Sequence, residues 1–189
     1  MAVAAAQIVA DLGLQAHPEG GYFRETYRAA EQVQTPRGPR SAATAILFLV
    51  TVAAPSRFHR LLSEEIWLHQ SGTPLELVML SPDSAGRSVT LGPPARGDEL
   101  RPQAVVPALT WQAARVACGS DADHGSCAAH GSDAAHGSSA TADPGATAEW
   151  SLVSCVVTPG FEYEDFELAR RDDLLSGWPQ ARDLILVLT

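Results

Sequence analysis

A histidine, a carboxylate and a second histidine recur at odd positions in residues 58–72, a run whose composition is typical of β-strands. Alternate residues of a strand point to the same face of a sheet. A strand pair here would therefore place His59, Leu61, Glu65, Trp67 and His69 on one face. Because sheets usually pack aliphatic side chains inward, imidazole and carboxylate groups on one face predict the lining of a polar cavity.

His59 and Glu65 are the candidate catalytic residues of this cavity. An imidazole and a carboxylate that reach one ligand can act directly as an acid/base pair, without a metal. Each residue alone has a plainer explanation, His59 as a hydrogen-bonded core histidine and Glu65 as an edge carboxylate. Their joint spacing, with Gly72 behind them, favours a cavity site.

The same run resembles the first motif of the cupin superfamily. That motif has a His-x-His pair, then a glutamate, then a glycine seven residues later. Glu65 and Gly72 keep the last spacing, and His59 occupies the place of the first histidine. Leu61 occupies the place of the second histidine, so one usual metal ligand of the family is lost.

Residues 107–116, PALTWQAARV, resemble the second cupin motif, with Gln112 in the place of its histidine. The resemblance implies a metal site of His59, Glu65 and Gln112, with His69 compensating for the lost ligand. Imidazole, carboxylate and amide groups, completed by water, suit Zn, Fe, Mn or Ni. Gln112 is a weak neutral ligand, so the metal-free acid/base pair stays the alternative.

Four blocks together look like the fifth cupin family, a group long described as a domain of unknown function. They are HPEGGYFRETYR (17–28), FHRLLSEEIW (58–67), VVPALTWQAAR (105–115) and TPGFEYEDFEL (158–168). This resemblance implies an all-β fold, the double-stranded β-helix or RmlC-like jelly-roll barrel, that is usually dimeric. It implies no agreed reaction.

Further ligand-binding candidates come from the first block and from two tryptophans. GGYFRE resembles the arm that, in sugar-nucleotide epimerase cupins such as the dehydrorhamnose epimerases, crosses into the partner subunit and contacts ligand. The likeness implies ligand contacts for Tyr22, Arg24 and Glu25, with Arg24 binding phosphate or carboxylate. A surface ion pair is the alternative for Arg24. Trp67 and Trp111 either pack in the core or form a flat wall for a planar ring or a sugar face.

Composition limits the partners and the compartment. The formal net charge of -9, from 22 acidic and 13 basic side chains, argues against nucleic acid and anionic membranes as partners. Cys118, Cys127 and Cys155 do not make a disulfide framework and suit free thiols in a reducing compartment. Residues 1–14 lack the features of a secretory signal, and the apolar run 42–54 is shorter than the roughly 20 residues of a membrane helix. We therefore expect a cytoplasmic protein.

Short strands punctuated by Gly and Pro predict one cupin domain over residues 1–189, with short N- and C-terminal helices. Residues 118–149 are mostly Gly, Ser, Ala, Asp and His, with His-Gly-Ser beginning at 124, 130 and 136. Such a segment cannot bury enough apolar surface to offset its ordering entropy, so we expect a disordered loop insertion. Its histidines and aspartates could hold a metal weakly, but a tolerated surface loop is favoured because no scaffold orients them.

Two classes of function follow from these features. The first is a small-molecule-binding cupin that acts as an isomerase or epimerase on a carbohydrate or similar small polar metabolite. Its reaction would need a base, an acid and a stabiliser for the enolate. The second is a non-catalytic binding or storage cupin with a degenerate metal site. In either case we expect a homodimer, because an uncovered sheet edge invites pairing.

Overall fold

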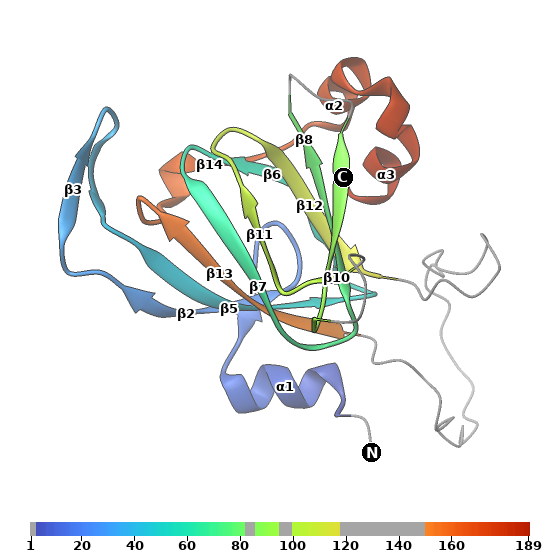
Figure 1. Cartoon of the computed structure of the whole chain (residues 1–189), viewed down its shortest axis with the longest axis horizontal. Coiled ribbons are helices and arrows are strands. Elements are labelled where there is room, and N and C mark those ends of the chain that lie inside the picture. The colour runs from blue at the N-terminus through green and yellow to red at the C-terminus, as the bar shows by residue number, and fades with distance from the viewer. Residues whose placement is uncertain (1–2, 82–85, 95–99, 118–149) are drawn as a thin grey trace.

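Two six-stranded sheets face each other and form most of the molecule (Figure 1). The computed structural model describes residues 3–81, 86–94, 100–117 and 150–189. The first sheet has the order β1 (Gln15–Ala16), β2 (Tyr22–Arg28), β5 (Thr44–Thr51), β13 (Trp150–Thr158), β7 (Glu64–Gly72) and β11 (Gln103–Val106). The second has the order β10 (Leu100–Arg101), β9 (Arg87–Leu91), β8 (Leu75–Leu80), β12 (Trp111–Val116), β6 (Ser56–Leu61) and β14 (Phe166–Leu168). The predicted all-β jelly roll is confirmed.

The main core lies between the sheets, and its strand β5 is apolar on both faces. In β5, Phe48 and Val50 point inward and join Trp67, Leu77 and other buried residues in the main cluster. Leu49 points outward and is fully buried all the same. A continuous apolar run is typical of a strand that is covered on both sides.

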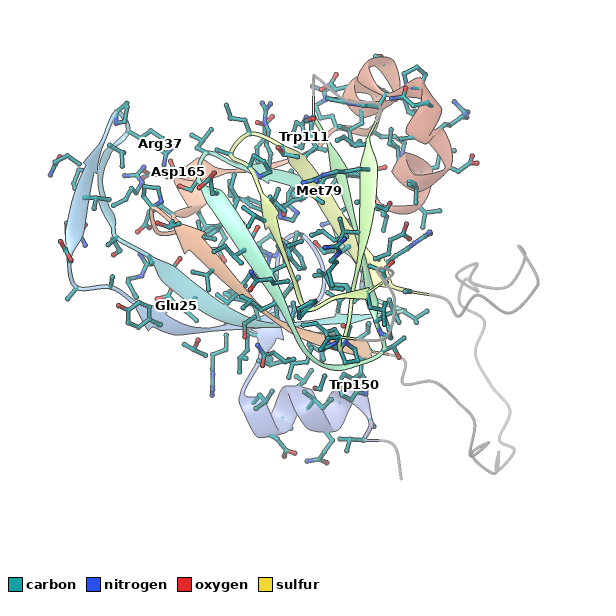
Figure 2. All side chains as sticks on the ribbon, viewed as in Figure 1. Glu25, Arg37, Met79, Trp111, Trp150 and Asp165 are labelled. Atoms are coloured by element: carbon teal, nitrogen blue, oxygen red, sulfur yellow. The ribbon has the colours of Figure 1, made fainter. Side chains whose placement is uncertain are left out.

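Helix α1 (Ala5–Leu12) covers the outer face of the first sheet (Figure 1). Its Ile8 packs with Leu14 and Leu49, and Trp150 packs against the same cluster (Figure 2). The helix ends at Gly13, whose left-handed φ of 60° caps the last turn. The predicted short N-terminal helix is therefore confirmed.

The C-terminal helices cover the outer face of the second sheet (Figure 1). They are α2 (Arg171–Gly177) and α3 (Arg182–Val187), with the 3-10 turn η2 (Pro179–Ala181) between them. Leu174 and Ile185 are buried against Phe58 and Leu80. In the described part of the chain no helix has the length and hydropathy to cross a membrane.

A two-stranded hairpin, β3 (Gln32–Thr35) and β4 (Gly38–Ser41), stands away from the sandwich (Figure 1). Arg40 on β4 donates from Nε and Nη2 to both carboxylate oxygens of Asp165, at 2.8 and 3.0 Å. Asp165 ends the 3-10 turn η1 (Tyr163–Asp165), and Arg37 lies beside it (Figure 2). The Arg40 hydrogen bonds are the main reason that the pKa of Asp165 lies below its usual value. The predicted loop at 118–149 falls outside the described residues.

Candidate functional site

A cavity of about 270 Å³ lies between the two sheets. Strands β2, β5, β7 and β13 of the first sheet line it, and β6 lines it from the second sheet. The turn between β1 and β2 and the segment after β13 complete the wall. The cavity therefore gathers residues from distant parts of the chain.

His59 and Glu65 both line this cavity and both are buried, with 2 % and 5 % of their surfaces exposed. The sequence predicts that they share one face of a strand pair, and that arrangement is wrong. β6 carries His59 in the second sheet, and β7 carries Glu65 in the first sheet. The chain turns at Leu62–Ser63 and crosses between the sheets, so the two residues approach the cavity from opposite walls.

Glu19, a residue that strand periodicity does not single out, is the carboxylate that pairs with His59. Its Oε2 lies 3.3 Å from His59 Nε2 and 3.3 Å from His17 Nδ1, and Ser56 Oγ donates to its Oε1 at 2.8 Å. Burial acts to raise the pKa of Glu19, but His59, His17 and Ser56 together outweigh burial and lower it. Glu19 is therefore held as a carboxylate.

The hydrogen-bond partners of His59 assign its protons. Nδ1 lies 2.8 Å from the carbonyl oxygen of Arg57, which can only accept, so Nδ1 carries a hydrogen. Nε2 faces the Glu19 carboxylate, which also only accepts. His59 and Glu19 are therefore buried partners at the cavity wall, and a hydrogen on Nε2 in addition to that on Nδ1 makes them an ion pair.

Glu65 has a different environment on the opposite wall. Gln112 Nε2 donates to Glu65 Oε2, and Gln112 Oε1 in turn accepts from Trp67 Nε1 at 2.9 Å. Burial raises the pKa of Glu65, and the neighbouring charge of Glu19 adds to this, while His59 acts against it. Cys155 hydrogen-bonds to Glu65, and burial raises the pKa of its thiol well above the usual value. Glu65 thus holds a proton more readily than Glu19.

An ion-pair network lies at one side of the cavity. Arg28 donates from Nε and Nη2 to the two oxygens of Glu25, at 2.9 and 2.8 Å. Arg28 Nη1 donates to Glu162 at 2.7 Å, and Nη2 also donates to the carbonyl of Phe161 at 3.1 Å. These contacts tie β2 to the segment that follows β13.

Comparisons with known proteins decide the family. A family model described as "Cupin superfamily (DUF985)" matches residues 6–169. The chain belongs to this cupin family. It is similar to a hypothetical protein from Leishmania major, with 32 % identity and a TM-score of 0.78 over 99 % of each chain. It is also similar to protein SO0799 from Shewanella oneidensis, with 28 % identity, a TM-score of 0.75 and coverage of 100 % of this chain and 98 % of that one.

A curated relative is the uncharacterized protein YML079W of Saccharomyces cerevisiae. It is 26 % identical over an alignment of 181 residues, which covers 89 % of this cupin and 77 % of the yeast protein. None of these three names states an activity. The function of this cupin therefore has to be argued from its own cavity.

The alternation of β2 decides which of the predicted arm residues reach the cupin cavity. Glu25 lines it, together with Phe23, which the sequence does not single out. Tyr22 and Arg24 lie on the other face of the strand. Tyr22 packs on the cluster beneath α1, and Arg24 Nη1 lies 3.6 Å from the place that a Cβ on Gly13 would take. The structure does not bring Tyr22 and Arg24 to the cavity.

Trp111 and Trp67 are also not part of the cavity lining of the cupin. Trp111 points from β12 toward the C-terminal helices, and the Arg60 guanidinium lies 4.4 Å from its ring centroid (Figure 2). The neighbouring Gln112 points inward because side chains alternate along a strand. Trp67 is buried in the core next to Phe48 and reaches the site only through its hydrogen bond to Gln112.

The predicted metal set is not assembled in this cupin. His69 shares the side of β7 that carries Glu65, but it lies four residues along, roughly 13 Å at 3.3 Å per residue. Its Nε2 contacts the carbonyl of Thr73 at 3.3 Å instead. Both ends of the Gln112 amide are already engaged by Glu65 and Trp67. Among the described residues, no group of three or more His, Cys, Asp or Glu side chains is placed to hold a metal ion.

Several cavity residues escape sequence periodicity because they come from turns or from a strand far away in sequence. His17 and Glu19 lie in the turn between β1 and β2, and Phe161 and Tyr163 follow β13. His17 stacks on Tyr163 with a centroid distance of 6.2 Å and meets the edge of Phe23 at 4.6 Å. The signal available in the sequence is only the presence of polar and aromatic residues in the blocks HPEGGY and GFEY.

Proposed function

We propose that this cupin binds a small polar metabolite in the cavity and moves a proton on it, as an isomerase or epimerase of a carbohydrate or similar compound does. The observation that carries the proposal is the contrast between Glu19 and Glu65. Both are buried, yet the pKa of Glu19 is lowered and that of Glu65 is raised. Two neighbouring titratable groups whose pKa values are shifted in opposite directions are typical of acid/base sites.

The roles follow from the contacts of each group. Glu65 is the proton-transfer group, because burial moves its pKa from the ordinary carboxyl range toward neutrality, where a general base works best. Gln112 donates to its Oε2, and in the proposal Oε1 faces a substrate carbon next to a carbonyl. In the proposed step Glu65 takes the proton from that carbon, and the electron pair moves to the carbonyl oxygen as an enolate.

His59 is the proposed stabiliser of the enolate oxygen. Glu19 and the Arg57 carbonyl orient its ring. The 3.3 Å between Nε2 and Glu19 is longer than the usual 2.7–2.9 Å of a charged hydrogen bond, so a ligand oxygen near the ring plane can share the Nε2 hydrogen with Glu19. Return of the proton to the opposite face of the same carbon would give the epimer. Return of the proton by Glu65 to the neighbouring carbon, with His59 giving a proton to the former carbonyl oxygen and taking one from the adjacent hydroxyl, would give the isomer.

The second candidate function is non-catalytic binding. The observation that favours it is the closed set of contacts around Glu65, where Gln112 and Cys155 already supply hydrogen bonds. A binding module would keep the cavity and make no use of proton transfer. The two candidates predict different results in deuterated water.

The deciding experiment incubates the protein in D2O with a panel of neutral aldoses and ketoses and follows deuterium at the carbon next to the carbonyl by NMR. We expect exchange with the wild type, a loss of about 10²-fold or more in Glu65→Gln, and full exchange in Glu167→Gln. Glu167 is the control because it lies on the edge strand β14, where it pairs with Arg60 of β6, and does not line the cavity. A sugar that binds without any exchange would overturn the enzymatic proposal and favour the binding module.

A further inference from the structure

We propose that the cavity selects its ligand by charge, accepting a small molecule with a protonated amine ahead of its neutral analogue and excluding carboxylates and phosphates. This inference rests on the proposed function in taking the cavity as the ligand site, and it narrows the class of ligand. Three observations support this inference. They are the charged groups that line the cavity, the hydrogen bonds that already occupy Arg28, and the aromatic side chains in the same lining.

The charges that line the cavity are predominantly negative. The described lining contains four carboxylates, those of Glu19, Glu25, Glu65 and Glu162, and Arg28 is its only arginine. His17 and His59, the other basic groups of the described lining, both contact Glu19, and Arg28 contacts Glu25 and Glu162, so carboxylates already pair with every basic group there. An anion brought into this space would lose its hydration and compete with these carboxylates for the same partners, whereas a cation would be attracted.

Arg28 is not available to bind an anionic ligand. Its guanidinium makes four hydrogen bonds, to Glu25 twice, to Glu162 and to the Phe161 carbonyl. A ligand carboxylate or phosphate would have to displace one of these glutamates and leave it unpaired beside the incoming charge. Arg24, the anion partner expected from the sequence, lies on the other face of β2 and cannot take over this role.

Aromatic rings surround the acidic groups. Phe23, Phe48, Phe161 and Tyr163 all line the cavity. Phe161 and Tyr163 meet edge to face, with centroids 5.1 Å apart. The face of an aromatic ring attracts a cation through its quadrupole, and this attraction grows when water is excluded. Carboxylates combined with ring faces favour an ammonium group over a neutral hydroxyl of the same size.

The test uses two series of matched probes that differ only in charge. The first is glucosamine, glucose and glucuronate, and the second is benzylamine, benzyl alcohol and benzoate, each titrated calorimetrically at pH 6.5. We expect the amine to bind about tenfold more tightly than the neutral member in at least one series, with no measurable binding of either carboxylate. Carboxylates that bind as tightly as the amines would overturn the inference, and so would amines that bind no more tightly than the neutral probes in both series.

Variants test whether the preference arises in the cavity. Glu25→Gln removes a negative charge and frees one of the two Arg28 donors that Glu25 engages, so the preference for the amine should fall about tenfold and carboxylate binding should become measurable. The control Glu76→Gln acts on an ion pair with Arg115 away from the cavity and should leave the preference unchanged. An amine preference that survives Glu25→Gln would overturn the inference. If the preference is lost only in Glu25→Gln but no sugar exchanges deuterium, the proposed reaction fails and the charge selection stands.

Discussion

At the scale of single residues, the cavity places two buried glutamates in opposite situations. Glu19 accepts from Ser56 and pairs with two histidines, so its carboxylate form is stabilised. Glu65 is held by a neutral amide and a thiol, and burial dominates its titration. Burying an ionised carboxylate lowers the stability of the folded protein, and such a loss of stability is common at functional sites.

The first prediction concerns Glu65→Gln. Burial raises the pKa of Glu65 above its usual 4.5, so the folded protein holds a proton that the unfolded chain has released, and stability falls as pH rises above 4.5. The glutamine side chain of the variant does not titrate. We expect the free energy of unfolding of Glu65→Gln to equal or exceed that of the wild type at pH 8, by up to about 2 kcal/mol, and to approach the wild-type value near pH 4. Urea unfolding at both pH values measures this.

A loss of about 1–3 kcal/mol in Glu65→Gln at pH 8, with ligand binding unaltered, would contradict the assignment of Glu65 to the site. Glu65 would then be a structural partner whose ionised form the fold needs. The same unfolding curves on Glu167→Gln, a substitution on the outer strand β14, give the baseline for removing a carboxylate.

The second prediction concerns Glu19→Gln, for which the sign is opposite. The pKa of Glu19 lies below the usual 4.5, so its contribution is present above pH 4.5 and is lost as pH falls toward the lower folded value. At pH 7 the amide should be less stable than the wild type by about 1–3 kcal/mol, because His59 and His17 lose their charged partner. This difference should shrink in urea unfolding at pH 3. A variant as stable as the wild type at pH 7 would rule out the ion pair.

At the scale of elements, one turn and its glycine position the carboxylate that pairs with His59. Gly20 follows Glu19 and has a φ of +112°, a conformation that residues with a side chain rarely adopt. A Cβ on Gly20 would overlap the carbonyl oxygen of Pro55. The Arg57 amide donates to the Glu19 carbonyl at 2.8 Å, which fixes this turn against β6. The β1–β2 turn and β6 thus form one unit that holds Glu19 opposite His59.

The third prediction follows from that turn. Gly20→Ala should destabilise the protein by about 1–3 kcal/mol for the strained backbone alone, with a further loss from the steric overlap, and should weaken ligand binding. Gly177→Ala is the matched control, since nothing lies within 4 Å of the place of its Cβ at the end of α2. Thermal unfolding of the two variants checks the contrast. Equal melting temperatures would show that the turn does not need its glycine.

At the scale of the whole molecule, the described residues on the two sides of the low-complexity segment, Ala117 and Trp150, lie close together. The Ala117 amide donates to the Pro74 carbonyl at 2.8 Å, and the Thr73 amide donates to the Trp150 carbonyl at 3.0 Å. Because Thr73 and Pro74 are adjacent, the two ends of the segment are neighbours in space. A short connection is therefore enough to join β12 to β13.

The fourth prediction is that deleting residues 120–146 and closing the gap with a short Gly/Ser turn leaves the sandwich intact. The removed sequence has almost no large apolar residues and adds nothing that a core could bury. We expect soluble expression and a melting temperature close to that of the full chain. Failure to express, or a large drop in melting temperature, would show that the segment contributes to stability.

The fifth prediction concerns assembly. We propose a homodimer in which the N-terminal arm and the sheet edge that it covers form the interface, because an exposed edge presents unpaired backbone groups. In the monomer the edge strand β1 has two residues and the β3–β4 hairpin stands away from the sandwich (Figure 1). Sedimentation at micromolar concentration should give about twice the 20.0 kDa mass of one chain. A single 20.0 kDa species would contradict the proposal.

Much of the architecture could be predicted from the sequence, because it depends on local pattern. The apolar run of β5 is buried on both faces, the short terminal helices lie where expected, and the cupin resemblance of the four blocks agrees with the family. Side-chain period also identifies Glu65 on the inward side of β7. These features need only neighbours along the chain and the hydrophobic effect.

Only the tertiary structure decided which residues share the cavity. Strand period cannot show that the chain crosses from one sheet to the other between His59 and Glu65, or that His69 lies too far along β7 to join them. Strand period also does not apply to turns, so the sequence could not place Glu19 in the cavity. Its position depends on the contact of the β1–β2 turn with β6. A sequence pattern indicates the side of a strand or helix on which a residue lies. A site, in contrast, depends on distances between elements that are far apart in the chain. Those distances are set only when the two sheets pack against each other.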